Sequence, residues 1–320
     1  MIKFYHTLTY QRRILIILGE KYKFTKLDKE KLKKYNIKQI VYNHKNPLDI
    51  INQIDIEIQK NKYQFFILNT KATLPKELVE YLNNIHLKGI RFITIEEFLE
   101  KYLKKLYIPK DNENVDYLSY LKPYNKLQYI IKRIIDFSVG IPLAILSSPI
   151  LVYSAYRIKK ESPDGPILFK QKRVGKNGEE FVCYKFRSMV PDAEKGKPQF
   201  ASKDDPRVFK WGAIMRKTRM DEIPQLINVF KAEMHIIGPR PERKYWIEQF
   251  EKEIPFYNER HLVAPGITGW AQVCYPYGEN VEDAYQKLTY DLYYIKNWSI
   301  LLEIKTIFKT IGVMIRGKGL

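Results

Sequence analysis

Short apolar runs alternate with longer amphipathic stretches over the first third of the chain. The apolar runs are RRILIILG, KQIVYN, QFFILNT and IRFITI. The stretch PKELVEYLNNIHLKG has the helical period, with a proline near its start and a glycine at its end, and EEFLEKYLKKL follows the last run. Strands that alternate with helices predict a parallel sheet. We therefore expect a Rossmann-like α/β domain over residues 1–108.

This expected domain lacks the glycine pattern of a dinucleotide site. No G-x-G-x-x-G follows the first apolar run. A structural or regulatory role is therefore favoured over nucleotide binding. The polar, turn-rich stretch YIPKDNENVDYLSYLKP comes next, and we interpret residues 109–124 as a linker.

The most apolar segment of the chain follows the linker. It has no charged residue from Phe137 to Tyr156, which is long enough to cross a bilayer core of ~30 Å. The basic residues that flank it on both sides are Lys132 and Arg133 before it and Arg157, Lys159 and Lys160 after it. A spanning helix normally has an excess of basic residues at one end only, so both ends here resemble cytoplasmic ends.

Ser147, Ser148 and Pro149 interrupt the second half of this segment. Proline removes one backbone hydrogen bond of a helix, and a serine hydroxyl can satisfy the carbonyl group that is left. A re-entrant membrane helix over about residues 130–157, which enters and leaves on the same side, accounts for the length, the flanking charges and the break. A simple transmembrane helix and a buried core helix remain open alternatives.

The charge balance favours an anionic partner. Lysine and arginine total 55 against 36 aspartates and glutamates, for a net charge of +19. Such an excess points to nucleic acid, an anionic membrane face or phosphorylated substrates, although a solvated lysine-rich surface explains it equally well. The two cysteines, Cys183 and Cys274, lie outside any C-x-x-C pair. Neither a zinc site nor a disulfide scaffold is indicated, and a reducing environment fits.

The stretch MRKTRMDEIPQLINVF holds two adjacent carboxylates, Asp221 and Glu222, directly behind three basic residues. Because proline is tolerated in the first turn of a helix, Pro224 predicts a helix start with Asp221 near the N-cap. The free N–H groups of a helix start favour phosphate, and Arg216 could reach the same anion. The stretch therefore indicates a phosphate site.

Two neighbouring stretches add basic side chains. Arg240 lies between two prolines in IIGPRPE, in a rigid turn that suits bidentate phosphate binding. The alternation in VCYKFRSM predicts Lys185 and Arg187 on one face of a strand. A carboxylate among such cations can attack phosphorus, and a second one can hold Mg²⁺ beside a diphosphate. A cluster of structural ion pairs explains the same spacing and remains open.

The motifs of residues 125–320 together resemble one family. In order they are KRIIDF with the Ser-Pro break, GPILFKQKRVGKNGEEFVCYKFRSM, DAE, DDPRV, MRKTRMDEIPQLINVFK, IIGPRP, PGITGWAQV and YDLYYIKNWS. The region is similar to the bacterial sugar transferases, also called monotopic phosphoglycosyl transferases, and its end is similar to the long exopolysaccharide-type members. The resemblance implies a mostly helical α/β catalytic domain with a re-entrant membrane helix.

The resemblance also implies a reaction. A sugar-1-phosphate passes from a UDP-sugar to polyprenyl (undecaprenyl) phosphate and UMP is released, through a covalent phosphosugar intermediate on Asp221. This step initiates polysaccharide or glycoconjugate synthesis. Glu222 is implied to be catalytic with Asp221 and to bind Mg²⁺. The implied substrate-binding residues are Lys185, Arg187, Arg216, Arg240, Gln272 and, at the lipid head group, Lys132 and Arg133.

The implied location is one leaflet of the bacterial inner membrane, at its cytoplasmic face. Ser148 and Pro149 are implied to break the membrane helix there. Self-association into a homodimer is a further expectation. The polysaccharide pathway, the sugar and the role of the N-terminal domain are left open, and Trp270 suits either a substrate pocket or simple packing.

The sequence departs from the family pattern in three places. Many long members begin with four transmembrane helices, and this sequence shows none before the α/β domain. The usual KGDMSLVGPRP reads KAEMHIIGPRP, with changes at Ala232, Glu233 and His235, and we expect the histidine to pack under the proline-flanked turn. Arg219 stands where a serine is usual and adds a charge near the phosphates. The carboxylate pair is unchanged, so activity is still expected.

Two other classes of function compete with a transferase. A basic protein that docks nucleic acid or anionic lipid would bind in a salt-sensitive way that does not depend on Asp221. Aromatic residues do not alternate with basic ones as in a stacking platform, so no nucleic-acid partner is expected. A membrane-bound phosphohydrolase would use the same Asp221 with water as the acceptor.

Overall fold

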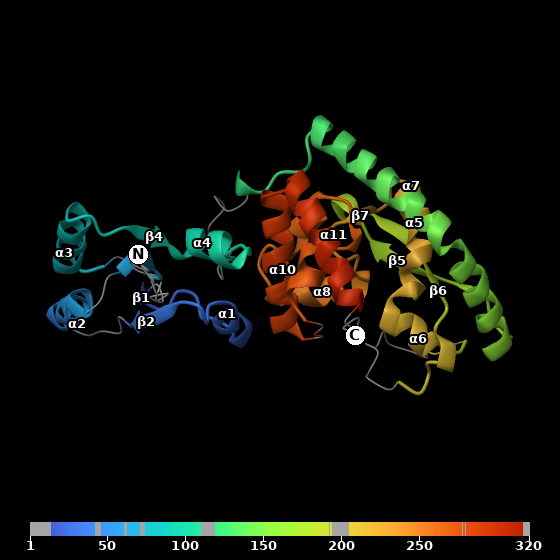
Figure 1. Cartoon of the computed structure of the whole chain (residues 1–320), viewed down its shortest axis with the longest axis horizontal. Helices are drawn as coiled ribbons and strands as arrows, with labels where there is room; N and C mark the ends of the chain where they lie inside the picture. Colours follow the sequence, from blue (N-terminus) through green and yellow to red (C-terminus); the bar gives the residue numbers. More distant parts are fainter. Residues whose placement is uncertain are drawn as a thin grey trace, which may run out of the picture. The chain divides into compact units, whose positions relative to one another are not determined.

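The computed structural model describes residues 14–41, 46–60, 63–70, 74–109, 119–191, 193, 205–276, 278 and 280–315. Contacts between residues divide the chain into two compact units, Met1–Tyr107 and Ile108–Leu320 (Figure 1). The predicted linker falls largely on residues 110–118, which lie outside the described residues.

The first unit is built on a parallel sheet of four strands in the order β2-β1-β3-β4. The strands are β1 (Ile14–Leu18), β2 (Asn36–Ile40), β3 (Tyr63–Leu68) and β4 (Phe92–Thr94). The helices are α1 (Lys26–Lys31), α2 (Pro47–Lys60), α3 (Lys76–Leu87) and α4 (Ile95–Phe98), which continues as a π-helical turn (Leu99–Leu103). The predicted α/β class with a parallel sheet is confirmed.

Alternate residues of the central strands separate two apolar layers. Ile17 and Ile67 pack in a cluster with α1 and α4, whereas Ile16 and Phe66 pack in a cluster with α2 and α3. Figure 1 shows the same division, with one pair of helices on each face of the sheet. Burial on both faces explains why these strands read as continuous apolar runs in the sequence.

The carboxyl ends of β1 and β3 form the crevice where sheets of this kind often bind ligands. Here Asn69 fills it: the side chain is fully buried, accepts a hydrogen bond from the backbone N–H of Tyr22 at 2.7 Å and donates to the carbonyl of Gly19 at 3.2 Å. Gly19 has φ +91°, and a Cβ there would lie 2.6 Å from the carbonyl oxygen of Asn69. The chain itself therefore occupies this position.

A buried ion pair also lies in the first unit, next to Tyr22. The Nζ of Lys105 lies 2.7 and 2.8 Å from the two carboxylate oxygens of Asp28 and also contacts the hydroxyl of Tyr22. The two charged side chains are 1% and 0% exposed. Burial opposes ionisation of Asp28, but the neighbouring Lys105 lowers the pKa of that carboxyl below its usual value.

The second unit combines one very long helix with short strands and helices. The elements are α5 (Lys126–Glu161), β5 (Leu168–Val174), β6 (Glu180–Phe186), α6 (Lys210–Thr218), the 3₁₀ helix η4 (Met220–Gln225), α7 (Leu226–Phe230), β7 (His235–Ile237), α8 (Lys244–Glu253), the 3₁₀ helix η5 (Tyr257–Leu262), β8 (Gly266–Thr268), α9 (Trp270–Cys274), α10 (Val281–Lys296) and α11 (Ile300–Ile315). Strands β5 and β6 form an antiparallel hairpin, and β7 pairs with β8 in parallel.

Helix α5 runs continuously through the predicted Ser-Pro break. Pro149 has no N–H to donate to the carbonyl of Ile145, and the hydroxyl of Ser148 donates to that carbonyl at 2.7 Å instead. Among the described residues, α5 is the one helix that is long and apolar enough to cross a membrane. The re-entrant turn stays a prediction, while the proposed use of a serine hydroxyl beside the proline matches this hydrogen bond.

The buried ion pair of the first unit gives a test of its stability. The variant Lys105→Met is expected to lower the free energy of unfolding by about 3–5 kcal/mol, because Asp28 keeps a buried charge without its partner. Adding Asp28→Asn removes that charge and restores most of the loss. Because the folded pKa of Asp28 lies below the unfolded one, the pair's contribution is present at neutral pH and disappears as the pH falls through the folded pKa.

Urea unfolding followed by circular dichroism measures these differences. A loss of less than about 1 kcal/mol for Lys105→Met would contradict a stabilising role for this pair, because exposed ion pairs already contribute that much.

Candidate active site

A cavity of about 910 Å³ opens within the second unit. Basic residues outnumber acidic ones ten to four among the described residues that line it. The basic residues are Arg173, Lys185, Arg187, Arg207, Arg216, Arg219, Arg240, Arg243, Arg260 and Lys287, and the acidic ones are Asp221, Glu222, Glu242 and Asp291. A concave site with this excess of positive charge attracts phosphorylated molecules.

The carboxylate pair lies on a tight turn of the chain. Helix α6 ends at Thr218, and Arg219 then adopts the left-handed conformation, with φ 57°. The chain continues as η4, which contains both carboxylates, before the five residues of α7. The predicted helix start near Asp221 is present as the 3₁₀ helix η4, with Arg219 rather than Asp221 at the N-cap, and the regular α-helix begins only at Leu226. A 3₁₀ helix of six residues gives little support to the helix-dipole argument for phosphate binding.

Glu222 is held by three basic side chains. Its Oε1 accepts from Lys185 at 3.1 Å and from Arg240 at 3.0 Å, and Arg219 lies 3.4 Å from Oε2. The side chain is 5% exposed. Burial alone would favour the neutral acid, but Arg240, Lys185 and Arg219 hold the pKa of this carboxyl well below its usual value. Glu222 is thus a permanent negative charge.

The pKa of Asp221 is shifted in the opposite direction. Burial, and then the negative charge of Glu222, raise its pKa above the usual range, while Lys185, Arg216 and Arg240 oppose that rise. Its carboxylate lines the cavity and makes no hydrogen bond or ion pair with the described residues. Two adjacent carboxylates with pKa values driven apart are typical of a pair with distinct chemical roles.

Arg240 depends on two residues that the sequence patterns did not single out. The guanidinium of Arg260 donates to the backbone carbonyl of Arg240 at 3.0 Å and to Asp291 on α10 at 2.9 Å. Burial raises the pKa of Asp291 to about 6, against the effect of its arginine partner. Asp291 lies in YDLYYIKNWS, a motif that was recognised without a role for this residue.

Lys185, Arg187, Arg216 and Gln272 also line the cavity, as does Arg240. The guanidinium of Arg187 is bonded to the hydroxyl and carbonyl of Ser162 and to the carbonyl of Pro166, so it fastens the end of α5 to the β5–β6 hairpin. The guanidinium of Arg216 makes no hydrogen bond or ion pair with the described residues, and its charge therefore remains available to an anion in the cavity.

The two basic residues assigned to the lipid head group do not line the cavity. Lys132 is 0% exposed and forms an ion pair with Glu303 of α11. Arg133 donates to the carbonyl of Val229 at 2.7 Å and to Asp136 at 3.2 Å. Their assignment rests on the resemblance alone, and both occupy structural positions here.

Trp270 and His235, whose roles the sequence left undecided, are also buried. Trp270 is 2% exposed, with Lys305 and Lys309 of α11 over its ring, so of the two roles left open by the sequence the packing role fits. His235 is 1% exposed and contacts Asp136 through Nδ1 at 2.6 Å. Neither lines the cavity.

A basic cavity with an adjacent carboxylate pair, joined to a long helix with exposed apolar side chains, is typical of proteins that handle phosphorylated substrates at a membrane. The chain belongs to the bacterial sugar transferase family, whose family model matches residues 127–317. The predicted family is confirmed.

Curated relatives carry related names. A UDP-N-acetylgalactosamine-undecaprenyl-phosphate N-acetylgalactosaminephosphotransferase of Aeromonas hydrophila is 41% identical over 246 residues, which cover 77% of this chain and 57% of the relative. A UDP-glucose:undecaprenyl-phosphate glucose-1-phosphate transferase of Escherichia coli (strain K12) is 40% identical, over 60% of this chain and 42% of the relative. The chain spans about half the length of these two proteins.

A shorter relative matches from end to end. The exopolysaccharide production protein PSS of Rhizobium leguminosarum bv. phaseoli is 38% identical over 201 residues, which cover 60% of this chain and 100% of that protein. The similarity therefore extends to a protein whose whole length corresponds to part of this chain.

The charge of the cavity predicts anion binding that can be measured without any reaction. Inorganic pyrophosphate is expected to bind with an affinity that falls as salt is added. Arg240→Ala should weaken binding about tenfold, which corresponds to about 1.4 kcal/mol. Lys176→Ala, on the exposed turn between β5 and β6, is the control and should bind like the wild type. Isothermal titration calorimetry gives both affinities, and equal binding by all three proteins would argue against a phosphate site at Arg240.

Proposed function

We propose that this protein transfers a sugar-1-phosphate from a UDP-sugar to polyprenyl phosphate, giving polyprenyl-diphosphate-sugar and UMP. The observation that carries the proposal is a pair of adjacent carboxylates on the wall of a strongly basic cavity, of which Glu222 is held by three basic side chains while Asp221 has no ion-pair partner among the described residues. The names of the relatives supply the substrate class, since they refer to undecaprenyl phosphate and to UDP-sugars.

Asp221 is the better nucleophile of the two carboxylates. Glu222 is occupied by three basic side chains, whereas Asp221 has no ion-pair partner among the described residues and lines the cavity. An oxygen of Asp221 attacks the phosphorus that carries the sugar and forms a new P–O bond. The bond from that phosphorus to the bridging oxygen breaks, and UMP leaves with the electron pair.

The second displacement regenerates the enzyme. An oxygen of the lipid phosphate attacks the same phosphorus, and the bond to Asp221 breaks to restore the carboxylate. Charge builds up on the phosphoryl oxygens in both steps. Arg240, Lys185 and Arg216 line the same cavity and stabilise that charge. The product begins a polysaccharide or glycoconjugate chain.

The carboxylate pair also suits Mg²⁺. This ion is commonly bound by one or two carboxylates together with substrate phosphates. Glu222 would hold the ion in place of one of the basic side chains that it contacts here, and the bound metal would neutralise the negative charge of the diphosphate. No group of three or more histidine, cysteine, aspartate or glutamate side chains that could hold a metal occurs within the described part of the chain.

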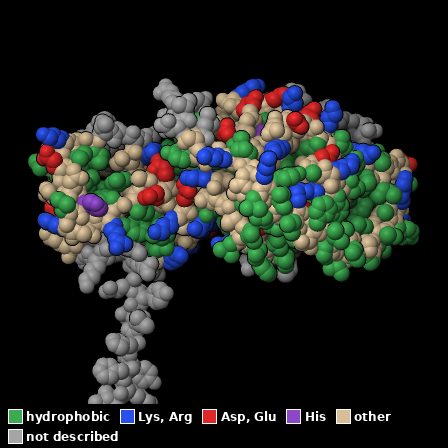
Figure 2. Space-filling view, turned by 90° about the horizontal axis from the view of Figure 1, so that it is seen from above, with side chains coloured by type: hydrophobic (Ala, Val, Ile, Leu, Met, Phe, Trp, Pro, Cys, Tyr) green, Lys and Arg blue, Asp and Glu red, His purple; other side chains and the backbone are tan. Residues whose placement is uncertain are grey.

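The location proposed for this reaction is the cytoplasmic face of the bacterial inner membrane. Figure 2 shows apolar side chains gathered over one side of the second unit. The exposed apolar residues of α5 include Ile134, Ile145, Leu146 and Val152, and those of α11 include Leu301 and Phe308. Exposed apolar surface on two helices favours contact with lipid. A re-entrant α5 would keep the cavity and both helix ends on one side.

The reaction predicts that UMP release depends on each carboxylate. The protein in nanodiscs, with polyprenyl phosphate, Mg²⁺ and single UDP-sugars, should release UMP with one donor. Asp221→Asn removes the nucleophile and should lower the rate by about 10³-fold or more. Glu222→Gln should lower it by about 10²-fold, because a charge next to the diphosphate is lost. Glu179→Gln, in another adjacent acid pair on an exposed turn, is the control.

Other products would identify other functions. Release of UDP instead of UMP indicates ordinary glycosyl transfer and contradicts a covalent role for Asp221. Phosphosugar released without lipid indicates a phosphohydrolase. Salt-sensitive binding of anionic lipid with no product from any donor supports a binding protein.

With a donor labelled in the phosphate next to the sugar, label should remain on the wild-type protein and be absent from Asp221→Asn.

The state of Asp221 predicts a pH profile. Burial and Glu222 raise the pKa of Asp221 to about 6. Since the attacking group is the carboxylate, the rate of UMP release should fall as the pH is lowered through that value, well above the usual aspartate range. A stopped-flow burst of UMP measured from pH 5 to 8 tests this. Circular dichroism over the same range controls for unfolding, and a burst that stays constant from pH 8 down to pH 5 would disprove the assignment.

A further inference from the structure

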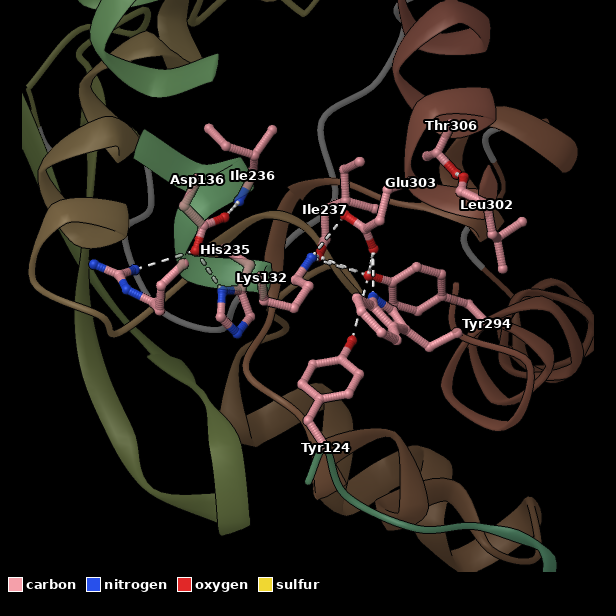
Figure 3. A network of polar contacts seen from close by, with 12 residues as sticks. Tyr124, Lys132, Asp136, His235, Ile236, Ile237, Tyr294, Leu302, Glu303 and Thr306 are labelled. Carbon is pink, nitrogen blue, oxygen red and sulfur yellow. Dashed lines mark hydrogen bonds and ion pairs between the residues drawn. The ribbon is translucent and has the colours of Figure 1, made fainter. Parts of the chain in front are cut away.

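A polar network lies in the interior of the second unit, outside the cavity (Figure 3). Its centre is Lys132 of α5, whose Nζ donates to the carbonyl of Ile237 at 2.7 Å, to Glu303 of α11 at 2.9 Å and to the hydroxyl of Tyr294 at 3.1 Å. The Lys132 and Glu303 side chains are 0% and 1% exposed. One ammonium group therefore joins α5, β7, α10 and α11.

The other members of the network satisfy the remaining polar groups. The hydroxyl of Tyr294 contacts Oε1 of Glu303 and lies 3.1 Å from the carbonyl of Ile237. The indole N–H of Trp298 donates to Glu303 at 2.8 Å. The hydroxyl of Tyr124 lies 3.3 Å from that of Tyr294. A buried ion pair persists only with such support, so its position is closely defined.

A second contact fixes the same strand one turn further along α5. Asp136 accepts from the backbone N–H of Ile236 at 2.9 Å and contacts Nδ1 of His235 at 2.6 Å. Asp136 is itself fully buried. Two successive turns of α5 thus make polar contacts with all three residues of β7, His235–Ile237.

Strand β7 leads directly to the site. Gly238 follows Ile237 and donates its N–H to the carbonyl of Thr268 at 2.9 Å, and the next carbonyl, of Pro239, accepts from Gly266 at 2.9 Å. A Cβ on Gly238 would lie 2.7 Å from the carbonyl oxygen of Ala264, so the backbone has no free space around it. A displacement of Ile237 must therefore move Arg240, which bonds to Glu222 at 3.0 Å.

We propose that Lys132 and Glu303 are positioning residues that hold the Arg240 turn against Glu222. They act through the carbonyl of Ile237, which accepts a hydrogen bond from Lys132. The same buried network thereby anchors helix α5 and fixes the geometry of the carboxylate pair. This inference rests on the proposed function. It gives Lys132 a different role from binding the lipid head group, and the two roles predict different kinetics.

The test uses the full-length protein in nanodiscs. Lys132→Met with Glu303→Gln removes both charges together, so that no unpaired charge stays buried. Tyr294→Phe is a milder variant that removes only the hydroxyl next to Ile237. The matched control is Lys105→Met with Asp28→Asn, which neutralises the equally buried ion pair of the first unit. Thermal unfolding of each variant shows that it is folded.

The first readout is a double-mutant cycle with Arg240→Ala. Removing the Lys132–Glu303 pair should lower the kcat of UMP release about tenfold in the wild-type background but less than about twofold when Arg240 is already alanine, because residues that act through one another are not additive. The KM for polyprenyl phosphate should stay within about twofold. An equal loss in both backgrounds, or a raised KM for the lipid, would overturn the proposal and favour head-group binding.

The second readout does not require activity. Amide hydrogen exchange should become at least about tenfold faster in peptides that cover residues 235–240 and 264–268 when the pair is removed, and stay unchanged in the control. If the wild type releases no UMP from any donor, the proposed function fails, and hydrogen exchange alone decides whether the network positions the turn. Unchanged exchange in these peptides would refute the positioning role.

Discussion

The requirement that Glu222 stay ionised while it is buried accounts for the arrangement of the site. A buried carboxylate needs compensating positive charge. Three separate elements supply it: β6 carries Lys185, the left-handed junction after α6 carries Arg219, and the turn after β7 carries Arg240. Each element must reach one carboxylate, so the hairpin, the η4 turn and the β7–β8 pair converge on one wall of the cavity.

The same charge determines the state of Asp221. Two neighbouring carboxylates cannot both ionise easily in a buried site. The basic residues bond to Glu222, which therefore takes the negative charge, and Asp221 is left with a raised pKa and no ion-pair partner in the described structure. Glu222 therefore stays charged and paired, whereas Asp221 is unpaired in the described structure and has a pKa of about 6, and the proposed reaction uses this difference. Because Asp221 and Glu222 are adjacent in the sequence, the charge of one raises the pKa of the other.

Sequence patterns predicted the features that depend on neighbouring residues. The apolar runs gave the parallel sheet, and the Pro-Arg-Pro turn gave Arg240 at the site. The patterns predicted a helix start near Asp221 but not its 3₁₀ form, which follows Arg219 in a left-handed conformation that an arginine gives no reason to expect. They did not find Arg260, Asp291 or the Lys132–Glu303 pair, whose partners are separated by 171 positions. Partners brought together by the fold leave no periodicity in the chain.

Helix α5 exposes apolar residues and buries two charged ones, and the buried charges connect the helix to the site. Its exposed positions are apolar, whereas its buried positions include Lys132 and Asp136. A helix that was anchored only by apolar packing could slide or rotate with little change in energy, because such contacts are not directional. Charged hydrogen bonds to β7 fix both its rotation and its register. Since β7 continues into the Arg240 turn, the proposed network couples the position of α5 to the position of Arg240.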